Sequence, residues 1–88
     1  MILYIYPDGS RIEEPDKKFS CGELIEFFKG WFTLRCVENS RKSGELYLCS
    51  LDPHGINPKD LPELNKPIKK MFNRDVCGVA ILASSNMF

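Results

Sequence analysis

The stretch DVCGVAILAS, residues 75–84, is almost continuously apolar and decides the fold. An apolar run without polar alternation is typical of a strand whose two faces are both buried. Gly78 indicates a bulge or the close approach of another segment, because it has no side chain. We therefore expect an interior strand here, lying between two hairpins formed earlier in the chain.

The first of these hairpins opens the chain. Residues 2–6, ILYIY, are β-branched and aromatic, and residues 10–14, SRIEE, form a polar strand that we expect at an edge of the sheet. The intervening Pro7-Asp8-Gly9 favours a tight turn, since proline fixes φ and glycine accepts positive φ.

The second hairpin is predicted from WFTLRCVE, residues 31–38, and ELYLCSL, residues 45–51, joined by the polar NSRKSG. In the first of these strands Phe32, Leu34 and Cys36 alternate with polar residues. In the second strand both alternating sets are apolar. A sheet covered on both sides, or a binding face, would each explain that pattern.

A helix is predicted between the two hairpins. Ser20 and Glu23 have the spacing of a capping box, so the helix should begin at Cys21. Gly30 is placed to end it in a left-handed conformation. Four large apolar residues share one face and are expected in the core: Leu24, Ile25, Phe27 and Phe28.

The segment LDPHGINPKDLPELNKP, residues 51–67, contains four of the six prolines and the single histidine. Each proline restricts the residue before it, so the backbone is stiff. Asn65 should cap a short helix over 66–72, whose inward residues are Ile68, Met71 and Phe72. A stiff loop in a small domain is either a functional surface or a cap over a core edge. We expect a pre-organised recognition loop.

These elements predict one α+β domain over residues 1–88, in the order β-β-α-β-β-α-β. We expect a small, mainly antiparallel sheet with a capped helix packed on one face. The chain is 43% hydrophobic and 11% aromatic, which is enough to fill one compact core.

The charge is balanced, with twelve Lys plus Arg and twelve Asp plus Glu. No overall field therefore attracts nucleic acid or a membrane surface. The first residues lack a basic region, and no apolar run approaches the roughly 18 residues of a membrane span. We expect a soluble, cytoplasmic protein with no membrane partner.

The four cysteines, Cys21, Cys36, Cys49 and Cys77, are spread along the chain without a Cys-x-x-Cys pair. We expect small buried hydrophobic residues, no metal and no cofactor. The alternatives are a four-thiolate site assembled in space and a contact between Cys36 and Cys49 across the hairpin.

An enzymatic function is not expected. His54 lies in a polar turn, and Glu13 and Glu14 are consecutive in a strand, so their side chains point to opposite faces. Paired-carboxylate catalysis needs two groups that converge on one substrate. A Cys–His pair of His54 with Cys49 or Cys77 has no support beyond the residue types.

Several short patterns together resemble a known family. They are IYPDGS (5–10), GELIEFFKGWFTL (22–34), LDPHG (51–55), LPELN (61–65) and DVCGVAIL (75–82). The chain resembles small domains of unknown function that are common in bacteriophage and mobile-element genomes. Those domains have Gly-Gly-Tyr-Ile-Glu where this chain has residues 29–33, and an Ala-Thr pair where it has Ile68 and Lys69. The resemblance implies a small protein that binds a host protein, including components of bacterial defence systems.

We therefore predict non-enzymatic binding to a host protein, with inhibition of a defence system as one form. The predicted partner-binding residues are Trp31, His54, Lys59, Lys66, Lys69, Lys70 and Arg74. The alternative is a nucleic-acid or small-nucleotide binding protein that uses the basic segment 66–74, although nearby acidic residues neutralise most of it. The oligomeric state stays open, a dimer included.

Overall fold

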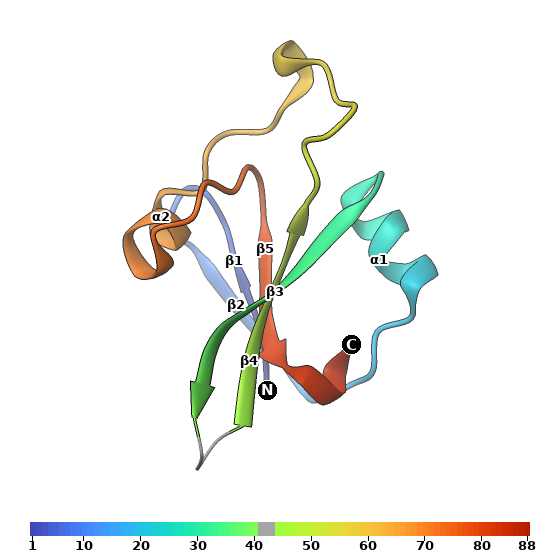
Figure 1. Ribbon diagram of the computed structural model, residues 1–88, viewed down its shortest axis with the longest axis vertical. Coiled ribbons are helices and arrows are strands. Elements are labelled where there is room, and N and C mark those ends of the chain that lie inside the picture. Colours follow the sequence, from blue (N-terminus) through green and yellow to red (C-terminus); the bar gives the residue numbers. More distant parts are fainter. Residues whose placement is uncertain (41–43) are drawn as a thin grey trace.

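The structure, a computed structural model, describes residues 1–40 and 44–88. Five antiparallel strands form one sheet in the order β2-β1-β5-β4-β3, with helices α1 and α2 on opposite sides (Figure 1). The strands are β1 (Ile2–Ile5), β2 (Arg11–Glu14), β3 (Phe32–Ser40), β4 (Gly44–Leu51) and β5 (Ala80–Ser84). The helices are α1 (Cys21–Phe28) and α2 (Lys66–Phe72), with short 3₁₀ helices η1 (Pro58–Asp60) and η2 (Ser85–Met87). The predicted α+β class is confirmed, and the two 3₁₀ helices are additions to the predicted order.

Strand β5 is the centre of the sheet, as the sequence predicts. It pairs with β1 on one side and with β4 on the other. Ile81 and Ala83 are buried on the α1 side, whereas Ala80 and Leu82 are buried on the α2 side. Burial on both faces explains why this strand shows no polar alternation.

The neighbouring strand β4 is also covered on both sides. Leu48 belongs to the core on the α2 side and Cys49 to the core on the α1 side. The apolar pattern of β4 could indicate either a sheet covered on both sides or a binding face. At Leu48 and Cys49 the structure supports the covered sheet.

The turn into β5 requires a glycine. Gly78 has a φ of +78°, and a Cβ atom there would lie 3.2 Å from side-chain atoms of Pro62. The predicted close approach at this position is confirmed.

Helix α1 begins with the predicted capping box. The Ser20 hydroxyl accepts a hydrogen bond from the Glu23 N–H at 3.1 Å, and the Ser20 N–H donates to the Glu23 carboxylate at 3.2 Å. Leu24 and Phe28 are buried against the sheet on this side. Phe19, just before the helix, belongs to the same core, so the start of the helix is fixed by both hydrogen bonds and packing.

Two expectations about α1 were wrong. The left-handed residue at its C-terminal end is Lys29, with φ 54°, and not Gly30. The helix thus ends one residue earlier than glycine placement suggests, at a conformational cost of roughly 1–2 kcal/mol for a residue with a side chain. Phe27 is 41% exposed and not a core residue, because it lies at the margin of the helix over the Tyr4 ring, with centroids 5.7 Å apart.

Helix α2 covers part of the opposite face. Ile68 is fully buried and Phe72 is half-buried against the same core, as expected. Met71 is 45% exposed, which contradicts the prediction that it faces inward. Its sulfur lies 4.0 Å from the Arg11 guanidinium, at the start of the exposed edge strand β2.

Asn65 fixes the position of α2 relative to the sheet. Its side chain is fully buried, and its oxygen accepts a hydrogen bond from the Ile68 N–H at 3.1 Å. Its amide nitrogen donates to the carbonyls of Ile5 and Gly78, each at 2.9 Å. The predicted helix cap is thus confirmed, and the same side chain also joins β1 to the segment before β5.

The two edges of the sheet differ. Strand β2 has four residues, all exposed, and it is the polar edge strand that the sequence predicts. Strand β3 has nine residues and pairs only with β4, with a bulge between Cys36 and Glu38. Part of the predicted turn over 39–44 lies outside the described residues.

None of the helices within the described ranges is long and apolar enough to cross a membrane.

Replacement of Asn65 by Ala should destabilise the protein by roughly 2–4 kcal/mol, because it removes a helix cap and two further hydrogen bonds of a fully buried side chain. Urea unfolding measures the change. The matched control is Asn57→Ala, since Asn57 caps the exposed η1 through a 3.1 Å hydrogen bond from the Lys59 N–H. Asn57→Ala should lower the free energy of unfolding by less than about 1 kcal/mol. Equal losses in the two variants would contradict the role given to Asn65.

Protonation of Glu23 should weaken the start of α1. The hydrogen bond from Lys17, followed by that from the Ser20 N–H, lowers the pKa of Glu23 below its ordinary value of 4.5. Because the folded pKa is the lower one, the stabilisation is complete above the ordinary value and is lost as the pH falls through the folded pKa. Urea midpoints measured against pH should therefore converge for wild type and Glu23→Gln in acid. A difference that stays constant from neutral pH into acid would contradict this assignment.

Candidate functional site

Trp31 lies between α1 and β3 and is 68% exposed. Its carbonyl accepts a hydrogen bond from the Asp52 N–H at 3.0 Å, which ties it to the base of the proline-rich loop. Leu34, in the first half of β3, is 39% exposed. Apolar surface therefore accompanies Trp31 along this edge of the sheet.

The proline-rich loop projects beyond the end of the sheet (Figure 1). It is ordered by local hydrogen bonds: the Ile56 N–H donates to the Pro53 carbonyl at 3.1 Å, and the His54 N–H donates to the Asp52 carboxylate at 2.9 Å. His54 and Lys59 are both exposed on this projection. The loop therefore presents these two side chains to solvent and does not cover an edge of the core.

The predicted basic residues of α2 divide into separate groups. Lys66, Lys69 and Lys70 are exposed on the helix, and Lys69 forms a 2.9 Å ion pair with Asp75. Lys66 and Lys70 line a cavity of about 440 Å³ that the helix shares with the β1–β2 hairpin. Arg74 does not line this cavity, so the predicted basic residues do not share one cavity.

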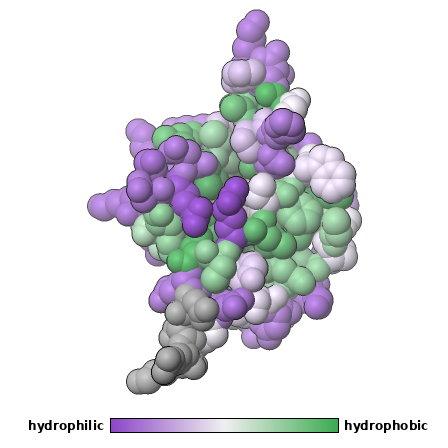
Figure 2. Space-filling model, in the orientation of Figure 1, coloured by the Kyte–Doolittle hydropathy of each residue, from purple (hydrophilic) through white to green (hydrophobic). Residues whose placement is uncertain are grey.

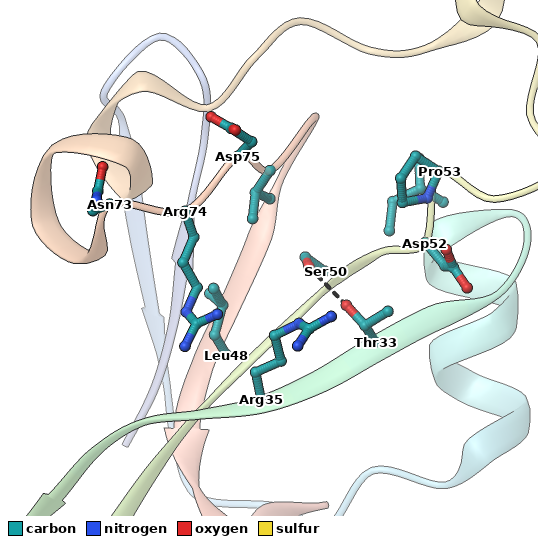
Figure 3. Close-up of a pocket in the computed structure, with 11 residues that line it drawn as sticks. Thr33, Arg35, Leu48, Ser50, Asp52, Pro53, Asn73, Arg74 and Asp75 are labelled. Carbon is teal, nitrogen blue, oxygen red and sulfur yellow. Dashed lines mark hydrogen bonds between the residues drawn. The ribbon is translucent and has the colours of Figure 1, made fainter.

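Arg74 instead lines a groove of about 520 Å³ between the end of α2 and strands β3 and β4. Figure 3 shows the Arg74 guanidinium entering this groove from the α2 side and that of Arg35 entering it from β3. In Figure 2, strongly hydrophilic surface lies in the middle of this face, and hydrophobic surface lies beside it. The groove thus brings together two arginines that are far apart in the sequence.

Of the residues that line this groove, the sequence prediction named only Arg74; the polar residues that it missed on strands β3 and β4 are Thr33, Arg35 and Ser50. Thr33 and Arg35 alternate with the apolar residues of β3, and this alternation already indicates in the sequence that the two side chains share one face of the strand. Ser50 lies opposite Thr33 in the observed register, and their hydroxyl oxygens are 3.2 Å apart. Without that register the three residues could not be assigned to one site.

A second groove, about 490 Å³ in volume, lies on the same side of the sheet beyond α2. Most of its lining is apolar, with Met71 and Phe72 of α2 above Leu3, Leu46 and Leu82 of the sheet. Helix α2 is too short to cover this part of the sheet, which leaves the side chains partly open to solvent.

The cysteine prediction was partly wrong. All four cysteines are free; Cys49 is buried, whereas Cys21 and Cys36 are exposed and Cys77 is half-buried. Cys36 lies opposite Tyr47, and Cys49 lies opposite Leu34, so the suggested contact between Cys36 and Cys49 does not occur. Within residues 1–40 and 44–88, no group of three His, Cys, Asp or Glu side chains could hold a metal ion.

The environment of Cys49 argues against a nucleophilic role. Burial raises its pKa to about 12, so at neutral pH the sulfur is a protonated thiol and not the reactive thiolate. His54 is exposed in the projecting loop. The expectation that the protein is not an enzyme stays a prediction.

Comparison of the chain with protein-family models, curated proteins and solved structures found no match.

Thiol labelling should separate the cysteines. A thiol reagent at about pH 8 should modify the exposed Cys21 and Cys36 quickly, whereas Cys49 should react only after unfolding, because its thiol is inaccessible and its pKa is raised. Mass spectrometry of the labelled peptides, with urea-denatured protein as the control, measures each site. Labelling of Cys49 as fast as that of Cys21 in the folded protein would contradict its assigned burial.

Proposed function

We propose that the protein is a non-enzymatic binding domain whose partner is a protein of the host cell. A single observation carries this proposal: Trp31, 68% exposed, lies at the start of the longest strand, β3. Among the described residues, β3 has a neighbour on one side only. An anchor residue and an open strand edge are thus adjacent.

The exposure of Trp31 favours a protein partner. Burying an aromatic side chain of this size removes on the order of 150 Å² from water, or about 4 kcal/mol before the costs of association. Tryptophan is also enriched among the few residues that contribute most to protein interfaces. Among the predicted site residues, Trp31 is therefore the one whose burial by a partner would contribute most to the free energy of binding.

The edge of β3 suggests how the partner binds. An open strand edge has unpaired N–H and C=O groups that can bind an extended segment of another chain. Strand β2 is short and carries Arg11, Glu13 and Glu14, which protect the opposite edge. The bulge after Cys36 interrupts regular pairing, so the docking stretch we propose is residues 32–36.

The identity of the host is suggested by the sequence resemblance alone. It implies a bacteriophage or mobile-element source, and hence a partner in the bacterial cytoplasm. We propose a component of a host defence system as the partner, with binding that inhibits it.

The alternative function, nucleic-acid or small-nucleotide binding through residues 66–74, is a separate proposal. Its lysines would contact phosphates, and binding would then weaken steeply with added salt because counterions are released. An interface anchored by Trp31 should respond weakly to salt. The division of the basic residues between two cavities is why we prefer the protein partner.

An affinity pull-down of the tagged protein from bacterial lysate, with and without nuclease, tests this function. We expect one stoichiometric protein that survives nuclease. Its affinity should fall at least about tenfold with Trp31→Ala, because interface anchors contribute that much or more. Leu34→Lys should also weaken binding, since a charge protects a strand edge.

Ile12→Ala is the matched control, because Ile12 is 48% exposed on the opposite edge strand. It should leave binding unchanged. Loss of binding on charge reversal of Lys69 and Lys70, with no effect of Trp31→Ala, would move the interface to α2. Recovery that depends on nucleic acid, or recovery of nucleotide alone, would overturn the protein-partner proposal.

A further inference from the structure

Two arginine side chains line opposite walls of the groove between α2 and the β3–β4 hairpin. Arg35 comes from β3, and Arg74 comes from the segment after α2, on the opposite wall (Figure 3). Arg35 is exposed and Arg74 is half-buried, and the half-buried Leu51 and the exposed Pro53 line the same groove. Two positively charged side chains thus share the groove with apolar groups that solvent can reach.

Neither arginine forms an ion pair within residues 1–40 and 44–88. Two carboxylates also line the groove, but both have other hydrogen-bond partners. Asp75 accepts a hydrogen bond from the Lys69 ammonium at 2.9 Å, and Asp52 accepts one from the His54 N–H at 2.9 Å. Both carboxylates point away from the guanidiniums in Figure 3, so neither of them occupies the guanidinium N–H donors of the groove.

Two hydroxyl groups add to the donors in the groove. Thr33 and Ser50 lie opposite each other on β3 and β4, with their oxygens 3.2 Å apart. Each hydroxyl has one proton, and their mutual hydrogen bond uses only one of the two. The other proton is free to bind a ligand beside the Arg35 side chain (Figure 3).

We propose that this groove binds a small organic phosphate of nucleoside monophosphate size. The phosphate lies between Arg35 and Arg74, because guanidinium groups bind phosphate oxygens in a bidentate manner. Two guanidiniums and a hydroxyl offer more donors than the two oxygens of a carboxylate require. The organic part lies against the apolar side chains of Leu51 and Pro53.

The size of the groove supports a small organic ligand. Pockets for such ligands occupy roughly 300–1,000 Å³, and this groove has about 520 Å³, much more than inorganic phosphate fills. A polynucleotide is less favoured, because it needs a continuous series of phosphate contacts. Lys66 and Lys70 lie in the other cavity and do not extend the arginine pair into a track.

Calorimetric titration of the whole chain with adenosine and uridine 5′-monophosphates tests the site. At least one should bind saturably with one-to-one stoichiometry. Adenosine, uridine and inorganic phosphate, titrated separately, should each bind at least about tenfold more weakly, since each lacks one half of the ligand. Arg35→Gln and Arg74→Gln should each weaken binding about tenfold or more.

Lys59→Gln is the matched control, because it removes the same charge from an exposed residue outside the groove. It should bind like the wild type. Circular dichroism checks the folding of each variant. If a glutamine variant unfolds, Arg35→Lys or Arg74→Lys replaces it, and should still weaken binding because lysine keeps the charge but loses the bidentate geometry.

The proposal is overturned if neither monophosphate binds, if inorganic phosphate binds as tightly, or if Lys59→Gln weakens binding as much as the arginine variants. It is also overturned if only a single-stranded oligonucleotide or an acidic peptide binds. The groove shares Thr33 and Arg35 with the docking stretch 32–36, but Trp31 does not line it, so Trp31→Ala distinguishes failure of the organic phosphate site from failure of the protein interface. Trp31→Ala should leave monophosphate binding unchanged.

Discussion

The buried amide of Asn65 is the interaction on which the α2 side of the molecule depends. It donates to the carbonyls of Ile5 and Gly78 and accepts from the Ile68 N–H. A carboxamide can donate two hydrogen bonds and accept at the same time, which neither a carboxylate nor a hydroxyl can do. One side chain therefore aligns the end of β1, the approach to β5 and the first turn of α2. The placement of Arg74 after that helix follows from the same alignment.

Much of the fold could be predicted because its signals are local. The capping box of Ser20 and Glu23, the turn at Pro7-Asp8-Gly9 and the cap at Asn65 each depend on residues within three or four positions of one another. The apolar run over 75–84 predicts a central strand, because apolar residues at successive positions indicate that both faces of the strand are buried. Local chemistry of this kind does not require knowledge of the tertiary structure.

The incorrect sequence predictions have a common cause: each depends on contacts between segments that are far apart in the sequence. Lys29, and not the following glycine, takes the left-handed conformation that ends α1, directly after the buried Phe28. Met71 is exposed beside Arg11 of the edge strand β2, whereas Ile68 of the same helix is buried, and the periodicity of a seven-residue helix cannot distinguish the two positions. Cys36 and Cys49 do not meet because the observed register sets other residues opposite them.

The arginine groove could not be predicted for the same reason. Alternation along β3 identifies the face that carries Thr33 and Arg35, but not what covers that face. Ser50 joins them through strand pairing, and Arg74 joins them through the position of α2. Each link is a tertiary contact that no sequence spacing encodes.

The projecting loop determines where the sequence of the protein can vary without loss of folding. Its base is closed by the Gly78 N–H, which donates to the Glu63 carbonyl at 2.8 Å, and by a bridge between Leu64 and Cys77. Residues 53–60 beyond it are exposed apart from the half-buried Ile56. Because this tip contributes little to the core, its sequence and length can vary at small cost to folding. The fold thus separates a constant framework from a surface that can diversify quickly, the division of roles found in antibody domains.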